Sequence, residues 1–237
     1  NRIGLAGSAN LISGNDRDGI LIQGRAASGN VVLDNVIGGD VDNNPLPNQG
    51  NGIRIADAPS NRIGAPNAGN YFIGSFARVD FFSSHGIFIR GSDARENRVR
   101  GNVITGFEAG VEIFGAEDNT IGGSEQGDAN IIGENLEDGI HIVAGSSGNV
   151  VVGNFIGTVD EEGSQAGNLR HGIRIAGRDT TDNTIGGAED GEANTIAFNA
   201  GDGVRIFNGS NELVRNSIFS NRGLAIDLLP TSERFRG

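Results

Sequence analysis

The sequence contains no cysteine, methionine, tryptophan or lysine. Without cysteine the chain has no disulfide framework, zinc ribbon, iron–sulfur centre or thiol nucleophile. No apolar run approaches the roughly 18 to 20 residues of a membrane-spanning helix, so we expect no membrane insertion. These absences exclude disulfide-rich secreted domains, thiol enzymes and helical membrane proteins.

Positive charge is also scarce. The 237 residues include 18 arginines against 30 aspartates and glutamates, which gives a formal net charge of −12. Because so acidic a surface repels phosphates, we expect no nucleic acid partner. Hydrophobic residues make up only 36% of the chain, whereas glycine numbers 40 and asparagine 27. This composition fits either a disordered chain or an ordered repeat with many turns, and the residue pattern decides between them.

One short pattern, glycine–aliphatic–any residue–aliphatic, recurs along the chain. Its eight copies begin at Gly19, Gly52, Gly86, Gly110, Gly139, Gly172, Gly203 and Gly223. The two aliphatic residues flank one residue of the opposite face, which is the period of a β-strand. Each run is too short and too closely bounded by glycine for a helix. The pattern therefore predicts eight similar strands.

Between these copies lie pairs of a second pattern, asparagine–any residue–aliphatic, whose spacing alternates. Wide pairs begin at Asn1, Asn61, Asn119 and Asn183, and narrow pairs begin at Asn30, Asn97, Asn149 and Asn211. A double repeat thus starts near residues 1, 61, 119 and 183, at intervals of 60, 58 and 64 residues. Each single repeat supplies three short strands, which bury a core only when copies stack and like strands pair in parallel.

We therefore predict an all-β, right-handed, single-stranded parallel β-helix (a β-solenoid) of about eight coils, forming one domain over residues 1–237. At about 4.8 Å between strands the stack is about 38 Å long. Aliphatic residues point inward, repeated asparagines stack their amides in ladders, and glycine before each strand permits a positive φ or a close backbone approach. Variable loops project from the corners and can carry function; they span 38–51, 74–85, 122–129, 157–171 and 186–193.

Several longer segments extend these patterns, namely Asn119-Thr120-Ile121-Gly122-Gly123, Gly153-Asn154-Phe155-Ile156-Gly157-Thr158, Gly203-Val204-Arg205-Ile206 and Asn216-Ser217-Ile218-Phe219-Ser220-Asn221. They resemble the right-handed parallel β-helix repeats of large bacterial surface proteins. The same broad class includes NosD-like carbohydrate-binding proteins, polysaccharide lyases and epimerases. The resemblance covers nearly the whole chain and implies an extracellular or cell-surface location, with further domains beyond this chain in a longer protein.

The outward residues of the glycine-led strands contain the candidate chemistry. In coils five to seven, the outward residues and the residues just before the glycines form one charged patch: Asp138, His141, His171, Arg174, Asp202 and Arg205. Histidine among carboxylates can act in general acid–base catalysis, and arginine can neutralise a uronate carboxylate. The other interpretation, which we favour, is ordinary cross-strand pairing on a solvated sheet, with His85 and His171 bonded to the backbone at corners.

Calcium is the only metal that the sequence brings into consideration, and we expect no other cofactor. Asp40-Val41-Asp42-Asn43-Asn44 begins like a calcium loop, but Pro45 stands where an EF-hand needs glycine and Asn51 where it needs glutamate. Asp160-Glu161-Glu162 is a second acidic segment, which is more typical of a solvated loop tip.

An aromatic group is the other unusual feature. Phe88 is an outward residue, and Phe81 and Phe82 precede it in the loop at 74–85. These rings can stack on a sugar or dock another chain, or else the loop folds over Phe88 and covers it.

The function that the sequence favours is structural: an extracellular or cell-surface stalk, adhesin or filament-like domain, with carbohydrate contact on one flank. The alternative is a polysaccharide-active enzyme (lyase, epimerase or hydrolase) acting in a groove on the outer face of coils five to seven. Because open coil ends expose unpaired strand edges, we expect other copies of the chain or flanking domains as partners there.

Overall fold

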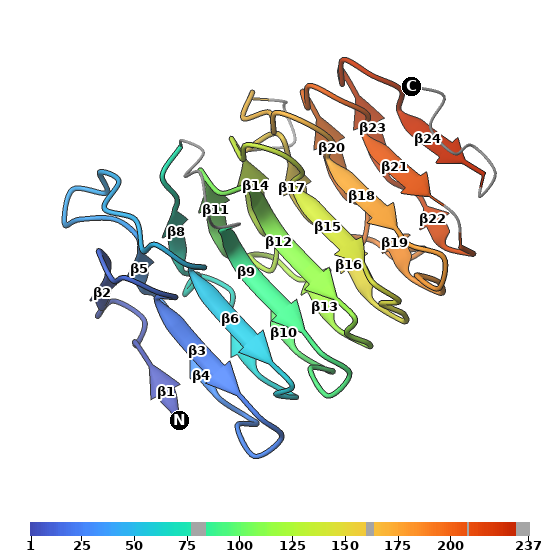
Figure 1. The fold of residues 1–237 in the computed structure, drawn as a ribbon. Helices are drawn as coiled ribbons and strands as arrows, with labels where there is room; N and C mark the ends of the chain where they lie inside the picture. Colours follow the sequence, from blue (N-terminus) through green and yellow to red (C-terminus); the bar gives the residue numbers. More distant parts are fainter. Residues whose placement is uncertain (77–83, 160–163, 208, 231–237) are drawn as a thin grey trace.

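The computed structural model describes residues 1–76, 84–159, 164–207 and 209–230. Phe81, Phe82 and the segment 160–162 lie outside these ranges. The described residues form 24 strands and no helix, so they include no helix that is long and apolar enough to cross a membrane. The strands build three parallel sheets of eight, and each coil gives one strand to each sheet (Figure 1). The predicted all-β parallel β-helix of eight coils is confirmed.

We number the coils 1 to 8 from the N-terminus and name the sheets in chain order. Sheet 1 contains β1 (Arg2–Ile3), β4 (Val31–Val32), β7 (Arg62–Ile63), β10 (Arg98–Val99), β13 (Thr120–Gly122), β16 (Val150–Val152), β19 (Thr184–Gly186) and β22 (Glu212–Val214). Sheet 2 contains β2 (Leu11–Ile12), β5 (Val36–Ile37), β8 (Tyr71–Ile73), β11 (Val103–Thr105), β14 (Ile131–Gly133), β17 (Phe155–Ile156), β20 (Thr195–Ala197) and β23 (Ser217–Phe219). Sheet 3 contains β3 (Ile20–Gln23), β6 (Ile53–Ala56), β9 (His85–Arg90), β12 (Ala109–Phe114), β15 (Ile140–Val143), β18 (Ile173–Ala176), β21 (Val204–Phe207) and β24 (Ile226–Leu229).

The core fills the space that the three sheets enclose. In the glycine-led strands the two aliphatic residues point inward, and Ile140 and Ile142 of β15 are fully buried. Sheets 1 and 2 add one hydrophobic residue per strand, usually aliphatic, such as Val151 and Ile156. Burying each such side chain stabilises the fold by about 1.5–3 kcal/mol. The outward residues between them are free to carry charge.

Coil 8 departs from the predicted alignment. The sequence pattern places the last strand at Gly223-Leu224-Ala225-Ile226, with Ala225 outward, but β24 pairs Val204 with Ile226 and Arg205 with Asp227. The strand therefore begins later, and Ala225 occupies the place of the usual glycine. In the described chain no further strand packs against this position, so it tolerates a Cβ. The outward residue of coil 8 is Asp227.

Two continuous asparagine ladders run through all eight coils at two corners. In each ladder, every Nδ2 donates to the Oδ1 of the asparagine in the next coil, over 2.8 to 3.1 Å. One ladder precedes sheet 1 and contains Asn1, Asn30, Asn61, Asn97, Asn119, Asn149, Asn183 and Asn211. The other precedes sheet 2 and contains Asn10, Asn35, Asn70, Asn102, Asn130, Asn154, Asn194 and Asn216. The predicted amide stacking is confirmed.

A third ladder precedes sheet 3, and the sequence patterns above did not include it. It joins Asn15 to Asn48, and separately Asn135, Asn168, Asn199 and Asn221. In coil 4 its place is taken by Phe107, whose backbone N–H donates to Asn135 Oδ1. This corner of coil 4 is shorter than in coil 5, and Phe107 is buried.

The glycines before the sheet 3 strands are needed because neighbouring coils approach them closely, not because their φ is positive. Gly139 has no positive φ, but a Cβ there would lie 2.7 Å from the carbonyl oxygen of Gly172 and 2.8 Å from Cγ2 of Ile156. Only glycine therefore lets the next coil lie this near.

The double repeat in the sequence arises because the corner between sheets 1 and 2 alternates between two forms. Coils 1, 3, 5 and 7 carry loops there, whereas coils 2, 4, 6 and 8 turn sharply. The sharp turns bond to the loop of the next coil, as Gly153 N does to Glu192 O and Gly101 N to Asp128 O. Loops two coils apart also approach each other, since a Cβ on Gly191 would lie 2.4 Å from Ser124 O. Because looped coils alternate with sharply turning coils, each loop has two strand spacings, about 9.6 Å, along the axis of the stack.

Candidate functional site

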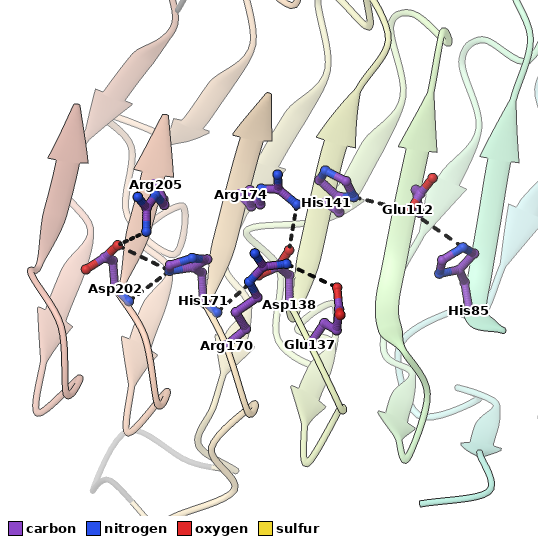
Figure 2. Close-up of polar contacts among 10 residues, drawn as sticks. All are labelled: His85, Glu112, Glu137, Asp138, His141, Arg170, His171, Arg174, Asp202 and Arg205. Carbon is purple, nitrogen blue, oxygen red and sulfur yellow. Dashed lines mark hydrogen bonds and ion pairs between the residues drawn. The ribbon is translucent and has the colours of Figure 1, made fainter. Parts of the chain in front are cut away.

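The outer face of sheet 3 carries a row of polar side chains that crosses five coils (Figure 2). Parallel pairing in register places Glu112 beside His141, His141 beside Arg174, and Arg174 beside Arg205. The residue just before each glycine adds a second row at the start of the same strands. The six residues predicted from sequence lie in these two rows, on coils 5 to 7.

The predicted residues are joined mostly to one another. Arg174 Nη1 lies 3.8 Å from Asp138 Oδ2, and Arg205 Nη1 lies 3.5 Å from Asp202 Oδ2. Arg205 Nε also lies 3.4 Å from Asp227 Oδ2. Both guanidinium groups thus have aspartate partners, which weakens the suggestion that they neutralise a uronate.

An aromatic ring further restrains these arginines. The guanidinium carbons of Arg174 and Arg205 lie 5.5 and 5.0 Å from the ring centre of Phe207. Cation–π contacts of this kind hold the two side chains against the sheet.

His171 has a backbone role. Its ring Nδ1 accepts a hydrogen bond from the backbone N–H of Asp202 at 2.9 Å. The backbone N–H of His171 donates to Asp138 Oδ1 at 3.1 Å. Nδ1 therefore carries no hydrogen, and the ring is neutral. Burial lowers the pKa of His171, although Asp138 and Asp202 oppose the shift and Arg205 supports it. A histidine fixed in this way links coils and is poorly placed to exchange protons.

The pocket on this face lies on coils 3 to 5, toward one end of the predicted patch. It is open to solvent and measures about 380 Å³. We call it the sheet 3 pocket; its lining residues are His85, Phe88, Arg90, Glu108, Ala109, Glu112, Phe114, Glu137, Asp138 and His141. Of the predicted site residues, the pocket contains Asp138 and His141 only.

Glu112 stands at the centre of this pocket between two imidazoles. Its Oε2 lies 3.2 Å from His141 Nδ1 and 3.5 Å from His85 Nε2. Burial raises the pKa of Glu112, but the hydrogen bond from His141 and the potential of both histidines and Arg174 outweigh burial, so the pKa lies below its ordinary value. Glu112 is therefore ionised at neutral pH, and His141 Nδ1–H donates to it.

His85 is held neutral. Burial lowers its pKa, against the opposing charges of Glu112 and Glu108. Its Nδ1 and the Nε2 of His141 are buried without a hydrogen-bond partner among the described residues. A buried polar atom left unpaired costs about 1–3 kcal/mol, a strain that functional sites often contain.

Aromatic rings form the apolar wall of the pocket. Phe88 packs on His85 with ring centres 5.1 Å apart and meets Phe114 edge-on at 6.4 Å. Phe114 is 44% exposed, and Arg90 lies 5.9 Å from the centre of the Phe88 ring. Phe88 thus faces the pocket, as its outward position predicts; whether residues 81 and 82 cover it lies outside the described residues.

Three pocket residues that were not predicted as site residues nevertheless follow the sequence pattern. His85, Phe88 and Glu112 occupy the same two columns as the predicted patch, in coils 3 and 4. What the sequence could not show is that the large rings of Phe88 and Phe114 flank a hollow there. In coils 6 and 7 arginine–aspartate pairs fill the equivalent surface.

The acidic segment at 40–44 has a structural explanation. Asp40 Oδ1 accepts hydrogen bonds from the backbone N–H groups of Asp42 and Asn44, at 2.9 and 2.8 Å. Hydrogen bonds from Asn44 and Asp42 lower the pKa of Asp40. The described residues contain no group of three or more histidine or acidic side chains that could hold a metal ion.

Comparisons with known proteins were made for the whole chain. No curated protein matches the sequence. Two solved structures of the periplasmic alginate epimerase AlgG are similar: a mutant, at 18% identity and a TM-score of 0.45, covering 94% of this chain and 47% of that chain, and another AlgG structure, at 17% and 0.38, covering 84% and 50%. This chain spans about half the length of these proteins. The family model described as "Right handed beta helix region" matches residues 68–235, so the chain belongs to the right-handed β-helix family.

Proposed function

We propose that this protein is a rigid extracellular or cell-surface β-solenoid that binds polysaccharide in the sheet 3 pocket. The observation that carries the proposal is the pairing of an aromatic wall, Phe88 and Phe114, with several carboxylates around one open hollow. Sugar rings present apolar faces that stack on aromatic rings and hydroxyl groups that donate to carboxylates. The strands below hold this arrangement rigid.

The charge of the pocket indicates the class of sugar. Four carboxylates line it, namely Glu108, Glu112, Glu137 and Asp138, against one lining arginine, Arg90. Arg170 and Arg174 pair with Glu137 and Asp138 from outside the lining, so a net negative charge remains. His85 adds no charge near neutral pH because burial lowers its pKa. Such a lining repels uronates and accepts hydrogen bonds, so the favoured ligand is a neutral or amine-bearing glycan.

Calorimetric titration with three oligosaccharides tests the proposal: a neutral glucan, a glucosamine oligomer and a polyuronate. We expect the first or second to bind and Phe114→Ala to weaken that binding about tenfold, because the stacking face is lost. Phe219→Ala is the matched control, since Phe219 is also exposed and aromatic but lies on sheet 2. No binding of either sugar, or binding of the polyuronate that Phe114→Ala weakens, would contradict the proposal.

Catalysis on the same face is the second candidate. It rests on His141, which lines the pocket and donates to an ionised carboxylate, as catalytic imidazoles often do. Incubation with the same three glycans, followed by assay for new reducing or unsaturated ends, tests it. Turnover that disappears in His141→Ala while glycan binding persists would establish an enzyme; binding without turnover supports the structural role.

A further inference from the structure

The outer face of sheet 1 carries an unusual pair of like charges. Arg62 on β7 and Arg98 on β10 are register partners on adjacent parallel strands, and both are exposed. Their Cα atoms therefore lie about 4.8 Å apart with the side chains on the same face. Like charges directly opposite each other on a sheet are destabilising.

Neither arginine has an ion-pair partner in the part of the chain that the structure describes. The outward arginines of sheet 3 differ in this respect: Arg54 lies 2.9 Å from Asp18, and Arg174 pairs with Asp138. Just after β10, Arg100 pairs with Asp128 at 3.0 Å. Arg174 and Arg205 are also register-paired arginines, but both have aspartate partners, whereas Arg62 and Arg98 both lack one among the described residues.

A hollow of about 280 Å³ lies beside this pair, lined by Ser60, Asn61, Arg62, Glu96 and Arg98. The one carboxylate among these lining residues, Glu96, accepts a hydrogen bond from Ser60 Oγ at 3.0 Å and forms no ion pair with either arginine. Thr120 follows Arg98 in register on β13 and adds a hydroxyl to the same row. The row therefore presents several donors on one rigid surface.

We propose that Arg62 and Arg98 form a binding site for an oxyanion, namely a carboxylate, sulfate or phosphate group. Guanidinium forks bind such groups with paired hydrogen bonds, and a shared anion removes the repulsion between the two arginines. The site lies on a different sheet from the sheet 3 pocket and is independent of the glycan proposed there. An acidic glycan and a free inorganic anion are the two sources of such a group.

Titration with sodium sulfate, sodium phosphate and a polyuronate oligosaccharide, each against sodium chloride at equal ionic strength, tests the proposal. Calorimetry and the melting temperature report binding. We expect saturable binding of at least one probe and a loss of tenfold or more in both Arg62→Gln and Arg98→Gln. Stronger binding of the oligosaccharide than of the inorganic ions would identify a glycan as the source, and the reverse would identify a free anion.

Two further variants separate a built site from general surface charge. Arg2→Gln removes an exposed arginine from the same outward column, where Val31 is the register partner, and should leave binding unchanged. Glu96→Gln removes the only carboxylate of the hollow and should strengthen binding. In buffer with chloride as the only anion, Arg98→Gln should raise the melting temperature, because one like charge is gone. Equal binding by wild type and the Arg62→Gln/Arg98→Gln double variant, or only a non-saturable salt effect, would overturn the proposal.

Discussion

Asn119 shows how a buried polar residue can stabilise a stack of coils. Its side chain is fully buried; Oδ1 accepts from N and Nδ2 of Asn97, and Nδ2 donates to Ala94 O and to Asn149 Oδ1. Every polar atom of the amide is therefore paired, and one residue links three coils. A hydrophobic residue at this position would leave several backbone groups without partners.

Asn119→Ala should lower the free energy of unfolding by about 2–4 kcal/mol, because it leaves buried donors and acceptors of Asn97 and Asn149 unpaired. Asn211→Ala, in the partly exposed last rung, should cost about 1 kcal/mol or less, since water can replace its bonds. Urea denaturation of both variants checks this. Equal losses would show that burial of the ladder does not determine its contribution.

His171 makes stability depend on pH. Because burial lowers its pKa in the folded protein, the unfolded chain takes up the proton first as the pH falls below about 6.5. The stabilisation is complete above that pH and declines below it, by at most about 1.4 kcal/mol per pH unit for this group. His85 acts with the same sign, and Glu112 adds a further loss at lower pH because its pKa is also lowered.

His171→Asn should therefore reduce the loss of stability between about pH 6.5 and 5. Asparagine can keep the backbone bond, as Asn51 does in the same column by accepting from the N–H of His85 at 2.9 Å. Urea denaturation at several pH values measures the slope. A slope identical to that of the wild type would mean that His171 does not contribute.

At the scale of single strands and corners, glycine sets how near two coils can come. Gly122 has a φ of 92°, and a Cβ there would lie 1.9 Å from Val152 O. Gly122→Ala should destabilise the protein by more than about 3 kcal/mol or prevent folding, because strain and a backbone clash add. Gly24→Ala is the control: its φ is 86° but nothing lies within 4 Å, so about 1–2 kcal/mol of strain alone is expected. Thermal melts followed by circular dichroism compare them, and similar melting temperatures would contradict the close-approach explanation.

Most elements were predictable because their pattern is local. An aliphatic–any–aliphatic triplet after glycine has only one way to bury its side chains, so seven of the eight sheet 3 strands agree with the structure. Coil 8 was misplaced because Leu224-Ala225-Ile226 and Ile226-Asp227-Leu228 both satisfy the triplet, and only pairing with β21 distinguishes them. The sheet 3 pocket could not be predicted, because it depends on how Phe88 and Phe114 tilt against each other in three dimensions.

At the scale of the whole molecule, alternation of looped and sharp corners predicts which coils can be added. Duplicating residues 119–182 adds two coils and keeps the alternation, so the longer protein should fold and lengthen by about 9.6 Å. Duplicating residues 119–148 adds one coil and places two loops on adjacent coils, where they collide. Soluble yield, circular dichroism and small-angle scattering compare the two insertions. If the 119–148 insertion folds as well, loop spacing is not what fixes the double repeat.

The asparagine ladders also give the stack a sense of direction. At every step the amide of one coil donates toward the next coil along the chain, and none of the rungs reverses. The two ends of the cylinder consequently differ in which hydrogen-bonding group the ladders leave open. Any coil that extended it, from this chain or from another, would have to arrive head to tail, because a mirrored encounter would bring donor against donor or acceptor against acceptor.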